Sequence, residues 1–108
     1  MVKTIFDGTA TGEITTDSFV VSRKNSVGIH VDNNSDVATI NFIMEGKVNS
    51  ADSFVPMRGE DGAVLSYAVD SGESAFIILP SIPLFTHMRI YVDATAATTG
   101  TLTVKALV

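Results

Sequence analysis

The residues that could perform chemistry are few, and the first candidates form an acidic segment. Asp32–Asp36 reads DNNSD, which matches the opening of an EF-hand calcium loop. The sixth position of that loop needs glycine and the twelfth a bidentate glutamate, whereas this chain has Val37 and Ile43 there. The segment therefore favours a plain turn of Asx residues over a calcium site.

Histidine and serine chemistry has equally little support. The chain has two histidines, His30 and His87, and neither has a second histidine or a cysteine two or four residues along that would complete a transition-metal site. The sequence has no Gly-x-Ser-x-Gly segment that could expose a serine nucleophile. We interpret both histidines as surface or hydrogen-bonded polar residues.

The acidic pairs fall where solvated turns are expected. Glu60 and Asp61 lie between two glycines, and Asp70 and Glu73 flank a Ser-Gly pair. A glycosidase would need two carboxylates across a cleft, one of them in apolar surroundings. The segment GEDGAV lacks the lysine and hydroxyl residue of a phosphate-binding loop. We therefore predict no catalytic residue, no metal, no cofactor and no enzyme activity.

Composition limits the partners. The 108 residues carry a net charge of −5 and no cysteine. An acidic chain with one basic pair, Arg23-Lys24, is not suited to binding a phosphate backbone, so we expect no nucleic-acid partner. Disulfides and thiolate metal sites are excluded. The N-terminal segment lacks a basic region followed by an apolar core, so we expect no signal peptide.

The elements that position these residues are expected to be strands. Glycine, Asx and hydroxyl residues punctuate the chain every eight to twelve residues, and β-branched residues fill the gaps. Four segments alternate apolar and polar side chains, and their predicted inward sets are Val27, Ile29 and Val31; Ala38, Ile40, Phe42 and Met44; Met88, Ile90 and Val92; and Leu102, Val104 and Ala106.

Turn chemistry suggests how these strands connect. DNNSD should close a hairpin between the first two segments, and TAATTG (Thr95–Gly100) a hairpin between the last two. Weaker strands bring the total to eight or nine. Each has one apolar face, so two layers are required. We predict one all-β domain over residues 1–108, a two-sheet antiparallel β-sandwich of jelly-roll or immunoglobulin-like type.

The most unusual segment is Ala75–Phe85, AFIILPSIPLF, with eight apolar residues, two prolines and one serine. It is too short and too proline-rich to cross a membrane as a helix, so we expect no membrane partner. Its first part should be a strand with Phe76 and Ile78 on one face and Ile77 and Leu79 on the other. Apolar residues on both faces predict that both faces are covered.

Two readings of the following loop remain open. Ile82, Pro83, Leu84 and Phe85 could fold back over one end of the sandwich, or form a proline-stiffened contact surface for another subunit. We expect the contact surface to include these four residues. The N-terminal segment MVKTIF is a second candidate, because a terminal strand can add to a neighbour's sheet edge.

The second half of the chain has FVP opening a strand, a DG turn, an aliphatic strand ending in LP, an RIYV strand and a closing TGTLTV hairpin. In these elements it resembles the small β-rich capsid decoration (cement) proteins of tailed bacteriophages. Some tail or fibre components share this pattern. The resemblance implies a protein without an active site that binds the outer capsid lattice, often as a dimer or trimer.

We therefore expect a structural virion protein, assembled in the host cytoplasm, that contacts the major capsid protein or other virion subunits and forms a homo-oligomer. The alternative is a carbohydrate-binding or adhesion module of the same fold. Such modules stack sugars on exposed aromatic rings, and Tyr91, predicted to point outward, is the candidate glycan contact.

Overall fold

The computed structural model describes residues 2–9, 12–21, 26–49, 51–59, 61–80, 86–93 and 99–107. The secondary structure of these residues consists of strands. The strands are β1 (Val2–Gly8), β2 (Ile14–Thr15), β3 (Phe19–Val20), β4 (Ser26–Ser35), β5 (Thr39–Lys47), β6 (Val55–Pro56), β7 (Ser66–Asp70), β8 (Ser74–Pro80), β9 (His87–Asp93) and β10 (Gly100–Leu107). Within these ranges, no helix has the length and apolarity needed to cross a membrane.

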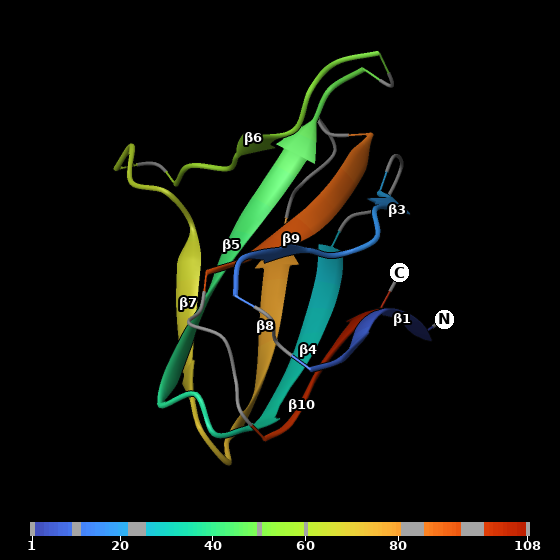
Figure 1. Ribbon diagram of the computed structural model, residues 1–108. Helices are drawn as coiled ribbons and strands as arrows, with labels where there is room; N and C mark the ends of the chain where they lie inside the picture. The colour runs from blue at the N-terminus through green and yellow to red at the C-terminus, as the bar shows by residue number, and fades with distance from the viewer. Residues whose placement is uncertain are drawn as a thin grey trace.

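The strands form two antiparallel sheets that pack face to face (Figure 1). Sheet 1 has the order β1-β10-β4-β8. Sheet 2 has β9 and β5 at its centre. The short strands β2 and β3 pair with the free side of β9, while β6 and β7 pair with the free side of β5. The predicted two-sheet antiparallel sandwich is confirmed.

The connectivity is that of a jelly roll. Pairs join the two halves of the chain from its ends toward its middle: β1 with β10, β2 and β3 with β9, β4 with β8, and β5 with β7. The chain is thus one long folded hairpin. When this hairpin is rolled up, β10 also pairs with β4 and β9 with β5, and these two pairs join the strands into sheet 1 and sheet 2. Of the two predicted sandwich types, the strand order selects the jelly roll.

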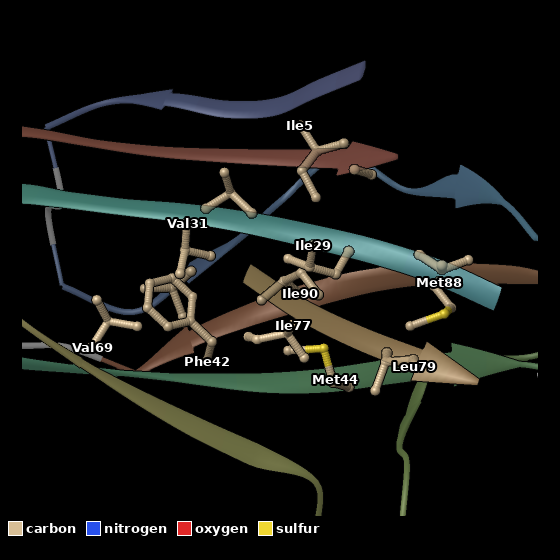
Figure 2. Close-up of a cluster of buried hydrophobic side chains, with 14 of the residues drawn as sticks. Ile5, Ile29, Val31, Phe42, Met44, Val69, Ile77, Leu79, Met88 and Ile90 are labelled. Atoms are coloured by element: carbon tan, nitrogen blue, oxygen red, sulfur yellow. The ribbon is translucent and has the colours of Figure 1, made fainter. Parts of the chain in front are cut away.

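The core lies between the sheets and is built from the alternate residues of each strand (Figure 2). Ile29 and Val31 of β4 face Phe42 and Met44 of β5 across this layer, and all four are fully buried. The inward sets predicted from alternation are confirmed on these strands and on β9 and β10. Ala38 is an exception: it precedes β5 and is exposed.

Both hairpins predicted from turn chemistry are wrong. β4 lies in sheet 1 and β5 in sheet 2, so the DNNSD segment leads the chain from one layer to the other. β9 and β10 are likewise in different sheets. In each case consecutive strands bring their apolar faces together across the core. A crossing of this kind buries the same alternating face as a hairpin would, so alternation could not distinguish the two.

Asn33 fixes the crossing between β4 and β5. Its carboxamide is fully buried, and Nδ2 donates to the carbonyl oxygens of Val37 at 3.2 Å and Val69 at 3.1 Å. Its Oδ1 accepts hydrogen bonds from the backbone N and the hydroxyl of Ser35, at 3.2 and 2.6 Å. The side chain therefore joins the β4–β5 connection to the end of β7 with all its hydrogen-bonding capacity used.

The backbone around Asn33 continues this network. Its N–H donates to the carbonyl of Glu73 at 3.0 Å, and its own carbonyl accepts from Gly72 N at 2.7 Å. Gly100 begins β10 beside it with φ of +84°, where an added Cβ would lie 2.1 Å from the carbonyl oxygen of Asn34. Figure 1 shows these connections gathered at the lower end of the sandwich. That end is closed by polar groups that satisfy one another.

Asn33→Ala is expected to lower the free energy of unfolding by about 3 kcal/mol, because it leaves two backbone carbonyls buried without their donors. Asn34→Ala, at the exposed neighbouring position, is the matched control and should change it by less than about 0.5 kcal/mol. Urea unfolding followed by circular dichroism measures both. Equal losses in the two variants would show that the buried amide does not hold this end together.

Candidate interaction surface

The candidate surface begins at β8, which forms one edge of sheet 1 and pairs with β4. Ile77 and Leu79 point into the core and are buried. Phe76 and Ile78 point the other way and are 51% and 63% exposed. The sequence predicted that both faces of this strand are covered. In the described part of the chain, only the Ile77 and Leu79 face is.

The exposed side chains of β8 belong to an apolar row that crosses the whole outer face of sheet 1. Strand register places Val2 opposite Leu107, Leu107 opposite Gly28, and Gly28 opposite Ile78. Residues opposite one another on neighbouring strands share a face of the sheet. Val2 is 59% exposed and Leu107 is partly exposed. We call these four residues together with Phe76 the apolar patch.

Gly28 allows the aromatic ring of the patch to lie against the sheet. A Cβ at this position would be only 2.6 Å from Cζ of Phe76, closer than carbon atoms approach without a shift. The ring of Phe76 thus covers the backbone of β4 where a side chain is missing. The result is a flat apolar surface over this part of the sheet.

The other end of the same face is polar. Register aligns Asp7, Thr103, Asp32 and Ser74 across the four strands. Thr103 Oγ1 donates to Asp7 at 3.3 Å, and the hydroxyl of Ser74 donates to Asp32. Both acids therefore have partners on the neighbouring strand.

His30 lies beside this row, with Nδ1 3.6 Å from Oδ2 of Asp32. Serine, aspartate and histidine are thus brought together, which the sequence did not suggest. The arrangement does not activate a nucleophile, because the hydroxyl of Ser74 donates to the carboxylate and not to the imidazole. We interpret the group as cross-strand hydrogen bonding.

The contact loop predicted from the sequence, Ile82, Pro83, Leu84 and Phe85, lies outside the described residues and stays a prediction. The residue after it is placed: Thr86 N donates to the carbonyl of Lys47 at 2.9 Å, and the carbonyl of Thr86 accepts from Val21 N at 2.9 Å. β8, which leads into the loop, carries the exposed end of the apolar patch.

Tyr91, the predicted glycan contact, lies on the outer face of sheet 2, opposite Ile43 and Thr15. Its hydroxyl is hydrogen-bonded to Glu13. That bond is the main cause that raises the pKa of Tyr91 above 10.0, and partial desolvation and the negative charges of Glu13, Asp93 and Glu45 add to it. The phenol of Tyr91 is therefore neutral at pH 7, and its hydroxyl already has a hydrogen-bond partner in Glu13.

A second cluster on this face was not anticipated. Arg89 Nε donates to Oε1 of Glu45 at 2.8 Å, and the guanidinium lies 4.3 Å from the centroid of the Phe54 ring. Nζ of Lys47 lies 4.8 Å from the same centroid. Alternation placed Glu45 and Arg89 outward, but only strand register shows that they are opposite one another. The cluster ties the segment before β6 to the sheet through cation–π contacts.

The DNNSD segment is not the Asx turn predicted from the sequence: Asp32–Ser35 are the last four residues of β4, and Asp36 begins the crossing to β5. Asn33 and Ser35, two of its possible oxygen ligands, point inward and bond to each other. Among the residues described by the structure, no three histidine or acidic side chains are grouped so that they could hold a metal ion.

No protein-family model matches the sequence, and no curated protein does. Solved structures share the fold. YomS, derived from the SPBc2 prophage, superposes with a TM-score of 0.60 at 13% identity, covering 98% of this chain and 88% of YomS. A protein of the Bacillus endospore appendages, described as disulfide-linked pili, has a TM-score of 0.57 at 15% identity, covering 98% and 84%.

A family 11 carbohydrate-binding module from Clostridium thermocellum, solved in complex with a β-1,3-1,4-mixed-linked tetrasaccharide, has a TM-score of 0.50 at 14% identity, covering 100% of this chain and 82% of the module. At these identities the likeness establishes the fold.

Replacing Glu13 with Gln is expected to lower the pKa of Tyr91 toward 10.0, because it removes a negative charge and a charged acceptor. Ultraviolet titration of the phenolate measures the pKa of Tyr91 when Tyr67→Phe has removed the other tyrosine. Glu73→Gln, which removes a different acid, is the control. Since the pKa is raised on folding, the bond stabilises the fold below about pH 10 and that stability is lost as the pH rises above the folded value. An unchanged titration curve in Glu13→Gln would contradict the assignment.

Proposed function

We propose that this chain is a structural virion protein of the capsid decoration (cement) type, which binds the outer capsid lattice and stabilises it. The observation that supports the proposal is the apolar patch on the outer face of sheet 1. Its most exposed members, Val2, Phe76 and Ile78, are 59%, 51% and 63% exposed. Exposed apolar side chains gathered on one face are typical of a protein–protein contact.

The energetics favour such a contact. Burying a large apolar side chain is worth roughly 1.5–3 kcal/mol relative to leaving it exposed, so covering Phe76 and Ile78 alone offers a modest attraction. A decoration protein gains its total effect by repeating a modest contact over many equivalent sites. The chain has no cysteine, so its contacts are not disulfide-linked. In this proposal the chain binds and does not catalyse.

The likeness to YomS and to an endospore appendage protein supports the proposal at the level of fold. One is derived from a prophage and the other forms pili, so jelly rolls of this size occur in both settings. The resemblance of the second half to capsid decoration proteins adds the specific role. Under this role the partners are the major capsid protein and other copies of the chain.

The double variant Phe76→Ser with Ile78→Ser is expected to weaken binding to capsids of the phage in question, measured by co-sedimentation, by at least about tenfold. Burying the two side chains is worth more than the roughly 1.4 kcal/mol that corresponds to a factor of ten. Val48→Ser with Val55→Ser, two valines that are 62% and 54% exposed, is the matched control and should bind like the wild type. Wild-type chain that remains in the supernatant would reject the function itself.

The predicted contact loop is tested separately. Leu84→Ser with Phe85→Ser should also weaken co-sedimentation, after circular dichroism has confirmed that the variant folds. Unchanged binding of this variant would remove the loop from the contact and leave the apolar patch as its site.

A carbohydrate-binding or adhesion role is the second candidate. Tyr91 lies on the outer face of sheet 2, and the fold is shared with a carbohydrate-binding module. This role predicts a glycan-array signal for the wild type that is lost in Tyr91→Ala. Tyr91→Phe, which keeps the ring and removes the hydroxyl bonded to Glu13, should retain stacking. A glycan array without any signal would contradict the role.

A further inference from the structure

The edges of the two sheets are not equally protected against pairing with another strand. β1 has an irregularity in its register between Thr4 and Phe6 and carries Lys3 and Asp7. Bulges and charges are the means by which edge strands avoid pairing. At one edge of sheet 2, β2 and β3 have two residues each. At the other edge, β6 has two residues and includes Pro56, and β7 has five residues and ends in Asp70. Each of these strands offers a shorter ladder than β8.

β8 differs from every other edge in the described part of the chain. It runs for seven residues, Ser74–Pro80, and contains no charged residue. Its pairing with β4 is continuous from Ser74 to Pro80, without a shift in register. A long, regular, uncharged edge with exposed apolar side chains is a template for strand addition.

We propose that β8 pairs antiparallel with β8 of a second copy of this chain, around a two-fold axis, so that two copies of sheet 1 become one continuous sheet. The inference deepens the proposed function and rests on it in one respect: the pairing joins the apolar patches of two copies into one row on the outer face of the continuous sheet, which is the surface that the proposed function assigns to the capsid contact.

The sequence of β8 is self-complementary in this arrangement. With Ile77 on the axis, Phe76 lies opposite Ile78 of the second copy, and Ile78 opposite its Phe76. Cross-strand pairs of aromatic with β-branched residues are favourable. On the inner face, small Ala75 lies opposite large Leu79. An interface that repeats the same patch on both subunits is the form that two-fold symmetry requires.

Charge favours a second copy over a basic partner. Each chain carries a net charge of −5, so the electrostatic repulsion between two copies is weakest where neither has an acidic residue at the contact. β8 provides that place, because its seven residues are neutral. Asp32, which approaches β8 from β4, already accepts the hydroxyl of Ser74. A basic partner would instead be drawn to the acidic residues elsewhere.

The contact is one strand wide and so belongs to the small end of specific interfaces. A dimer whose population depends on concentration is therefore expected, rather than a permanent one. The chain's lack of cysteine means that this dimer cannot be disulfide-linked.

Ile78→Lys and Val2→Lys form a matched pair for the test. Both place a positive charge at an apolar residue that is about equally exposed, at 63% and 59%, on edge strands at opposite sides of sheet 1. Sedimentation velocity over a range of concentrations should show that wild type and Val2→Lys dimerise alike. Ile78→Lys should raise the dissociation constant by at least about tenfold, because lysine on an edge opposes pairing.

Cysteine pairing tests the register. The chain has no cysteine, so Phe76→Cys and Ile78→Cys each carry a single thiol. Opposite residues on antiparallel strands are close enough for a disulfide, whereas residues displaced by two positions are not. A mixture of the two variants under mild oxidation should form a covalent heterodimer, and each variant alone should not. Val2→Cys mixed with either is the control.

The outcomes separate this inference from the proposed function. A wild-type chain that stays monomeric at every concentration, or an Ile78→Lys variant that dimerises like Val2→Lys, overturns the β8 pairing whatever happens with capsids. A monomeric wild type that loses capsid binding on Ile78→Lys would support the proposed function and overturn the inference. A dimer with the expected disulfide pattern that does not co-sediment with capsids supports the inference and rejects the function.

Discussion

The jelly roll depends on the chain crossing between its two sheets without leaving buried backbone groups unpaired. Asn33 meets that requirement where β4 gives way to β5, since one fully buried amide bonds the carbonyls of Val37 and Val69 and accepts from Ser35. A bulky apolar residue there would fill the space, but it would leave both carbonyl groups buried without a hydrogen-bond donor. The same few atoms hold the β7–β8 connection through Gly72 and Glu73, so the starting point of β8 is set by this network.

Alternation is a local property, and it predicted the core well. Val27, Ile29 and Val31 are buried because each points to the same side of one strand, and no knowledge of neighbours is needed to see this. Strand partners are a long-range property. The DNNSD segment has the composition of a hairpin turn, yet its inward Asn33 and Ser35 make it a crossing between layers. Turn chemistry is compatible with both outcomes, and only the pairing of β4 with β8 and β10 decides between them.

The candidate surface differs from the predicted contact loop, which stays a prediction. The two-sided apolar character of Phe76–Leu79 predicted that both faces of this strand are covered, whereas in the structure Phe76 and Ile78 are exposed on the face turned away from the core. That β8 lies at a sheet edge could not be predicted, because edge position depends on the order of all the strands in sheet 1. The row of residues from Val2 to Ile78 could not be predicted either. Its members come from both ends and the middle of the chain, and only register brings them into line.

Rolling a hairpin into two sheets leaves edges at the first strand and near the fold of the hairpin, and this chain treats them differently. β1 pairs through an irregular register and carries charges, whereas β8 keeps seven neutral residues in unbroken register. An exposed, regular edge invites association, so in a protein that worked alone the same protection would be expected on both. The outer side of β8 could lose Phe76 and Ile78 without opening the core, because Ala75, Ile77 and Leu79 are the residues of β8 that face it. The core therefore does not require those two side chains, and the proposed pairing with a second β8 accounts for them.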